Sequence, residues 1–224
     1  MKKYIILCLV TMLLSSCAQK ITRGEQYAKM YEEKPLSIVV MPPINQTNHV
    51  EAKDYFYTTL YAPLCEKGYY VFSPMMTMEL FQSESAYDAE QFIEGDLSQF
   101  RKVLGADAAM FTKIKSWKRN NIGGKLTAGV EYILRSTKTG ETLYQREGLI
   151  TVDTSVGNSS SPIGLLVNVV ATAIKTAATD KVVAGRACTV FVLSDMPEGK
   201  YGTMYDKDQK QLAGKSYIKG MVKK

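Results

Sequence analysis

The segment KLTAGVEYILRS, residues 125–136, decides the fold because its apolar and polar side chains alternate almost without interruption. A period of two places successive side chains on opposite faces of a β-strand. A strand of this kind belongs to a sheet with one covered and one wet face, and the covered face needs helices over it. The apolar face consists of Leu126, Ala128, Val130, Tyr132 and Leu134, and the polar face of Lys125, Thr127, Glu131 and Arg135.

Two further strand-like segments flank this one, Ala108–Lys118 before it and Thr142–Asp153 after it. Residues 120–124 and the tetrapeptide Lys138-Thr139-Gly140-Glu141 separate the three segments and are rich in turn-forming residues. Short turns of this kind connect antiparallel neighbours. The sequence therefore predicts a three-stranded meander over residues 108–153.

The residues before the meander alternate between strand and helix patterns. Leu36–Met41 is a short apolar run closed by two prolines, as expected for a strand buried on both faces. A helical pattern begins at Ala52 and is interrupted near Pro63. A second short strand, a helix that starts at a proline, an acidic loop and a helix that ends at a glycine follow. These four segments are Tyr69–Phe72, Met75–Phe81, Gln82–Asp96 and Leu97–Leu104.

The segment Pro162–Ala178, after the meander, predicts a helix that is apolar on almost every side. Its uncharged stretch, residues 162–174, is too short to span a bilayer. Such a helix is either deeply buried or covered by a partner, which includes a second copy of the chain. The element order β-α-β-α-α-β-β-β-α predicts an α+β fold with a single mixed β-sheet of about five strands and helices packed over it.

The first 17 residues read as a bacterial lipoprotein leader. Lys2 and Lys3 precede the apolar run Tyr4–Leu14, which is too short to cross a membrane, and the leader ends in Leu14-Ser15-Ser16-Cys17. This tetrapeptide resembles a lipobox, so we expect Cys17 to be lipidated and to become the new N-terminus. The absence of an aspartate at the next position, Ala18, implies transport to the outer membrane.

We therefore divide the chain into four parts. Residues 1–16 are the signal peptide, 17–34 a lipidated tether, 35–193 the α+β domain, and 194–224 a C-terminal basic extension. Within the tether, Glu25–Tyr31 can instead form a helical turn that packs on the domain. An acyl chain contributes about 0.8 kcal/mol per buried methylene, so the three chains of a mature lipoprotein would anchor it stably.

The charge balance gives no support to nucleic-acid binding. The chain has 28 basic and 22 acidic residues, and loss of Lys2 and Lys3 with the leader reduces the net charge to +4. Basic residues gather in the first strand of the meander, where they share the parity of Trp117 and are expected to face solvent. They form either a binding surface or a solvated face on which the indole rests. This candidate surface consists of Lys113, Lys115, Trp117 and Arg119.

Catalytic and metal-binding patterns are absent from the sequence. The one histidine, His49, lies in a polar turn, and none of the common nucleophile, phosphate-binding or zinc motifs occurs. The acidic residues of the loop 82–96 lack the spacing of a calcium loop. We accordingly predict no catalytic residues, no metal and no cofactor.

Cys65 and Cys188 are the thiols that remain in the mature chain once Cys8 leaves with the leader and Cys17 carries lipid. In an oxidising periplasm two such cysteines can form a disulfide, which would close a loop of over a hundred residues. In the chain-entropy model that bridge contributes about 4–5 kcal/mol. Two buried free cysteines are the alternative.

Four short motifs together resemble a family of bacterial lipoproteins of unknown function. The resemblance covers roughly residues 14–193, and its motifs are mostly core and turn positions. They are IVVMPPIN at 38–45, YFYTTL at 55–60, EKGYYV at 66–71 and LGADA at 104–108. The family is similar to the amino-terminal domain of the Tol-system periplasmic protein and to the periplasmic domain of the curli secretion channel, neither of which is an enzyme by fold.

The resemblance implies a non-enzymatic protein-interaction module, anchored in the outer membrane and facing the periplasm. Members of the family are often encoded beside a lipoprotein that resembles the curli channel. The implied partners are the membrane, through the lipid, and envelope proteins such as that channel-like lipoprotein. A binding module for a small molecule or cell-wall fragment, with a pocket around Trp117 and Tyr132, is the alternative.

Overall fold

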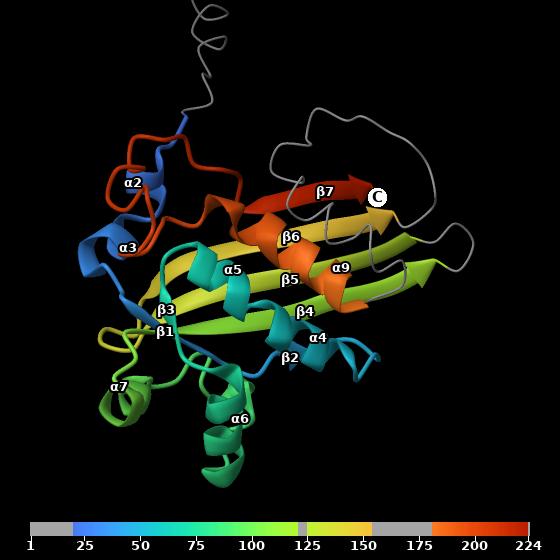
Figure 1. Ribbon diagram of the computed structural model, residues 1–224, viewed down its shortest axis with the longest axis horizontal. Coiled ribbons are helices and arrows are strands. Elements are labelled where there is room, and N and C mark those ends of the chain that lie inside the picture. The colour runs from blue at the N-terminus through green and yellow to red at the C-terminus, as the bar shows by residue number, and fades with distance from the viewer. Residues whose placement is uncertain (1–19, 121–124, 154–180, 224) are drawn as a thin grey trace, which may run out of the picture.

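The computed structural model describes residues 20–120, 125–153 and 181–223 (Figure 1). Its helices are α2 (Arg23–Gln26), α3 (Ala28–Glu33), α4 (Ala52–Thr59), α5 (Tyr61–Glu66), α6 (Pro74–Ser83), α7 (Ser98–Leu104) and α9 (Lys181–Val192), with 3-10 turns η1 (Ala89–Gln91) and η2 (Leu193–Asp195). Its strands are β1 (Ser37–Val40), β2 (Ile44–Asn45), β3 (Tyr70–Val71), β4 (Ala108–Asn120), β5 (Lys125–Ser136), β6 (Thr142–Asp153) and β7 (Tyr217–Lys223).

The strands form one mixed sheet in the order β3-β1-β4-β5-β6-β7, and β2 also pairs with β4. β3, β1 and β4 run parallel, β4, β5 and β6 form the predicted antiparallel meander, and β7 lies parallel to β6. The predicted α+β class with a single mixed sheet is confirmed. The sheet is larger than the predicted five strands because the two-residue β2 and the C-terminal β7 join it.

Helices α4 and α9 cover one face of the sheet, which α9 crosses in the foreground of Figure 1. The alternating apolar residues of β5 all lie in this core, as predicted. Tyr132 is fully buried here, and its hydroxyl lies 2.7 Å from Thr189 Oγ1 of α9. Close contact between α9 and β6 requires Gly148, since a Cβ there would lie 2.4 Å from Val192 Cγ2.

A second and smaller core lies on the other face of the sheet. It is built by α6, α7 and the loop between them against β1 and β4, and includes edge-to-face contacts of Phe100 with Phe81 and Phe92. α6 begins at Pro74 and α7 ends before Gly105, which has a φ of 71°, as predicted. This core reaches β5 only at Ile133, so it covers the β1–β4 half of the face.

The break between α4 and α5 falls at Leu60 rather than at Pro63. Pro63 is the third residue of α5, where its missing N–H has no helical acceptor in any case, so it does not interrupt the helix.

The domain boundaries at residues 34 and 193 do not separate structural units. α2 and α3 occupy the region predicted as a tether, so the alternative of a helix at Glu25–Tyr31 is the correct one. The predicted basic extension contributes η2 and β7, and its segment 196–216 lies beside α2 at one end of the sheet (Figure 1).

Three predictions fall outside the described residues: the signal peptide 1–16, the lipidation site Cys17 and the apolar helix at 162–178. Among the helices that are described, none combines the length and the apolar composition needed to cross a bilayer.

Candidate interaction surface

The β5–β6–β7 half of the second sheet face carries no helix from the described part of the chain. Side chains of alternate residues point outward from it, and the exposed fractions of Tyr217 and Met221 are 44% and 48%. Thr127 and Thr151 lie side by side there, with their hydroxyl oxygens 3.0 Å apart. We call this surface the open face; it consists of Thr127, Leu149, Thr151, Tyr217, Lys219 and Met221.

A charged cluster borders the open face on the side of β4. Lys115 Nζ lies 2.9 Å from a Glu131 carboxylate oxygen and 2.6 Å from one of Glu147, and Gln145 Nε2 donates to Glu131 at 2.6 Å. Burial alone would raise the pKa of Glu131, but the hydrogen bonds from Gln145 and Lys115 outweigh it and leave the pKa below its usual value. Glu131 therefore carries its charge at neutral pH, and Lys115 is bound within this cluster rather than in a basic patch.

The predicted surface of Lys113, Lys115, Trp117 and Arg119 is corrected by a β-bulge. Ile114 pairs with Val130 but Ser116 pairs with Gly129, so Lys115 is an extra residue in β4. A bulge of one residue moves every later side chain to the opposite face. Trp117 is consequently 4% exposed, packs against Tyr55 and Phe56, and is not part of a solvent-facing surface.

The other members of the predicted surface do not form one site either. Lys113 is half-buried and Lys115 exposed on the second face, while the Arg119 side chain is outside the described residues. A signal for the bulge exists in the sequence at Gly129, which stands between Thr127 and Glu131 on the polar face of β5 and carries no side chain. A Cβ at that position would lie 2.6 Å from Ser116 Oγ, so glycine is what makes room for the bulged strand.

A pocket of about 420 Å³ opens at the sheet edge beside the open face. β7 first pairs with β6 at Glu147, so residues 142–146 of β6 have no strand on that side within the described residues. The pocket lies along this free stretch. Its lining includes Gln26, Tyr27, Glu131, Tyr144, Gln145, Arg146, Glu147, Ser216 and Tyr217.

The two cysteines of the mature domain are free and differ in environment. Cys65 is exposed on α5, whereas Cys188 is fully buried on the sheet-facing side of α9, with its sulfur directed toward the carbonyl oxygen of Ala128 at 3.9 Å. The predicted disulfide is absent because α9 directs its cysteine at the sheet while α5 directs its own at solvent. Burial raises the pKa of the Cys188 thiol, which makes it unreactive.

We expect the lipid-free thiols to label in two steps. In the folded protein a maleimide should modify Cys65 rapidly and Cys188 not measurably, and unfolding without a reductant should release the second thiol. The Cys65→Ser variant, which should show no native labelling, is the control. If the unfolded, unreduced protein showed fewer than two reactive thiols, the disulfide hypothesis would be supported again.

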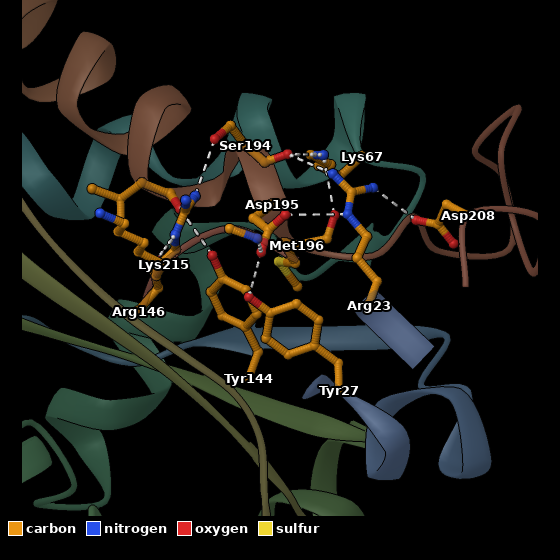
Figure 2. Close-up of polar contacts among 12 residues, drawn as sticks. Arg23, Tyr27, Lys67, Tyr144, Arg146, Ser194, Asp195, Met196, Asp208 and Lys215 are labelled. Carbon is orange, nitrogen blue, oxygen red and sulfur yellow. Dashed lines mark hydrogen bonds and ion pairs between the residues drawn. The ribbon is translucent and has the colours of Figure 1, made fainter. Parts of the chain in front are cut away.

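A buried polar network, which we call the terminal latch, joins the two ends of the described chain (Figure 2). Arg23 of α2 lies between two carboxylates, 3.2 Å from Asp195 and 3.1 Å from Asp208. The hydroxyl of Tyr27 donates to Asp195 at 2.7 Å, and that of Tyr31 to Asp208 at 2.8 Å. Both carboxylates are almost completely buried, with exposed fractions of 6% and 0%.

The latch extends to β6 and the end of α9. Arg146, which is 5% exposed, donates to the carbonyl oxygens of Val192 and Lys215, and Tyr144 also donates to Val192 (Figure 2). Burial raises the pKa of the Tyr27 hydroxyl, and its bond to Asp195 raises it further, so this group remains a donor at physiological pH. Gly214 donates its backbone N–H to Asp195 at 2.8 Å.

No group of three histidine, cysteine or acidic side chains among the described residues is placed to hold a metal ion. His49 lies exposed in its turn, and the loop 84–97 is used for packing, through Ala89, Ile93 and Leu97, rather than for a convergence of carboxylates.

Comparison with known proteins identifies the relatives of this chain. A match to the family described as "Putative lipoprotein GNA1162-like" covers residues 25–201. The chain belongs to this family. The lipoprotein family that the sequence motifs resembled is thereby confirmed.

A curated sequence and a solved structure from Neisseria meningitidis are similar to the GNA1162-like chain. The sequence, described as "Putative lipoprotein NMB1124/NMB1162" of serogroup B strain MC58, is 25% identical over 183 residues, which cover 81% of this chain and 85% of the relative. The crystal structure of lipoprotein GNA1162 matches with a TM-score of 0.50 at 25% identity, and covers 64% of this chain and 100% of the solved one. A structure of the PelC dodecamer from Paraburkholderia phytofirmans also matches, with a TM-score of 0.44 at 13% identity over 75% and 91% of the two chains.

Proposed function

We propose that this protein is a non-enzymatic lipoprotein of the outer membrane, anchored through Cys17, that faces the periplasm and binds another protein of an envelope or secretion-associated assembly. Membership of the GNA1162-like lipoprotein family supports the anchor. The lipobox at residues 14–17 supports it independently.

The observation that carries the binding role is the open face. One face of an antiparallel sheet is often solvated and polar, whereas exposed apolar groups within a polar rim mark interaction sites. Here Tyr217 and Met221 are about half-exposed on one strand, and the charged cluster of Lys115, Glu131 and Glu147 forms the rim. A partner that covers this face would bury the apolar pair and meet charges of both signs. Such an arrangement favours a specific partner over non-specific hydrophobic association.

Crosslinking in intact cells tests this proposal. A photoreactive amino acid at position 221, on the open face, should give a discrete crosslinked species identifiable by mass spectrometry. Position 76 on α6 is the matched control, because Met76 is also an exposed methionine, at 71%. The substitution Met221→Glu should abolish most of the binding to the captured partner, while Met76→Glu should leave it intact. Equal adducts from both positions, or none from 221, would contradict the assignment of the open face.

The pocket supports a second candidate, a binding module for a small polar molecule or cell-wall fragment. The pocket expected around Tyr132 and Trp117 cannot serve, because both side chains are buried in the core. The pocket at the edge of β6 has a different lining, with glutamates, glutamines, tyrosines and Arg146. A rise in melting temperature on addition of muropeptides, together with no crosslink from position 221, would favour this function over the first.

A further inference from the structure

The folded part of the chain begins close to the proposed anchor. Lys20 is three residues from Cys17, so at about 3.3–3.6 Å per residue the two cannot be more than about 11 Å apart. Any surface next to Lys20 is therefore held near the bilayer once Cys17 carries lipid. This step rests on the proposed lipidation.

The surface next to Lys20 is fixed by backbone pairing with the C-terminal segment. Thr22 forms an antiparallel bridge with Leu212, and Ala213 N donates to the Ile21 carbonyl at 2.8 Å. Arg23 N donates to the Gln211 carbonyl at 2.8 Å. The first described residues thus cannot swing away from residues 209–213, and the terminal latch directly behind them makes this pairing rigid.

The ladder carries exposed aliphatic side chains, one on each strand, and exposed lysines close to them in the sequence. Ile21 and Leu212 have exposed fractions of 47% and 56%, large for residues of their kind. Lys20 and Lys210 are their exposed neighbours along the chain. We call these four residues the anchor corner. Exposed aliphatic side chains flanked by lysines are typical of protein surfaces that rest on a lipid interface.

The acidic residues of the region are already bound to other groups. Asp195 and Asp208 are buried and share Arg23, Asp206 is paired with Lys34 at 2.7 Å, and the exposed Glu25 accepts from Thr22 N at 2.8 Å. Lys200, Lys207 and Lys215 are additional exposed bases on the same C-terminal segment. Lysines close to an anionic membrane are attracted to it, so the corner favours a negatively charged surface.

We propose that the anchor corner lies on the anionic phospholipid surface that holds the lipid anchor, and so sets the orientation of the domain. The lipid supplies the affinity, and the corner supplies the direction. α6 then points away from the bilayer, since it projects below the sheet in Figure 1 whereas α2 lies above it. The open face, on the opposite side of the sheet from α9, remains free for a protein partner.

Site-specific fluorescence on the full lipidated chain tests this orientation. In a Cys65→Ser background, Leu212→Cys and Met76→Cys each introduce one exposed thiol for an environment-sensitive dye, and both native side chains are exposed, so neither change should disturb folding. The chain is reconstituted into vesicles of phosphatidylglycerol and phosphatidylethanolamine that contain a lipid-borne quencher. We expect strong quenching at 212 and little at 76. Equal quenching at the two positions would overturn the proposal.

Two further measurements separate the sources of failure. Lys210→Glu combined with Lys207→Glu should reduce the quenching at 212 several-fold in these vesicles, whereas no difference between anionic and phosphatidylcholine vesicles would contradict the electrostatic part. If purified peptidoglycan, but not vesicles, changed the emission of the dye at position 212, the corner would be assigned to the cell wall instead. Intact-mass measurement of the lipid on Cys17 comes first: its absence refutes the proposed function, while its presence without quenching refutes only the orientation.

Discussion

Replacing Asp195 with alanine is expected to lower the free energy of unfolding by about 3–5 kcal/mol. The carboxylate accepts hydrogen bonds from Arg23, Tyr27 and the backbone of Gly214, and it is 6% exposed. Its removal leaves the Tyr27 hydroxyl and the Gly214 N–H without their acceptor. The largely buried guanidinium of Arg23 then has Asp208 as its one remaining carboxylate partner. Buried groups that lose their partner carry the full cost of desolvation, which is why the effect is large.

Urea denaturation followed by the fluorescence of Trp117, the single tryptophan of the chain, measures this change. Asp206→Asn is the matched control, since Asp206 also pairs with a basic residue across the same interface but is exposed, and asparagine tolerates its φ of 58°. Exposed ion pairs contribute about 0–1 kcal/mol, so the control should be close to neutral. If the two variants unfolded at the same urea concentration, the terminal latch would have no special role in stability.

Trp117→Ala should also cost about 3–5 kcal/mol, because it removes a fully packed aromatic side chain from the core. The indole stacks on Tyr55 at a centroid distance of 5.8 Å and meets the edge of Phe56 at 5.6 Å. Simple alternation predicts that Trp117 faces solvent, and a tryptophan in such a position would contribute little to stability. The variant therefore tests whether the β-bulge at Lys115 sets the register.

Circular dichroism must follow this unfolding, since the substitution removes the fluorophore. Lys118→Ala, at the next position and exposed, should change the free energy of unfolding by no more than about 0.5 kcal/mol. A neutral Trp117→Ala would place the indole outside the core and revive the predicted binding surface.

Local patterns in the sequence were sufficient for the elements that obey one period. β1 follows from a continuous apolar run and the meander from alternation. α6 follows from its proline start and α7 from its glycine stop. β7 could not be found this way. Its core-facing position Gly220 carries no side chain, and the space is filled by the ring of Phe191, since a Cβ there would lie 2.7 Å from Phe191 Cζ. A periodicity analysis counts apolar side chains on the strand itself, so it misses an apolar side chain that a helix places at the same position.

The candidate site was harder to predict than the fold. One extra residue in β4 moved Trp117 from the expected face to the other, and only the exception at Gly129 hinted at it. The terminal latch has no local signal at all, because Arg23 and its two carboxylates are 172 and 185 positions apart. The N-terminal stretch is polar and the C-terminal one is rich in lysine. From the sequence alone, charged residues that are solvated cannot be told from charged residues that are buried against each other.

That separation has a consequence for maturation of the protein. The partners of α2 are made last, so a chain that crosses the inner membrane from its N-terminus cannot pack residues 23–31 until Asp208 has emerged. At ribosomal speeds of 5–20 residues per second, that interval is on the order of tens of seconds. Under the proposed lipidation, the stretch around Cys17 would stay attached to unfolded polypeptide throughout this interval, within reach of the enzymes that cleave a leader and attach lipid. Burial of the N-terminal helices afterwards would close that window.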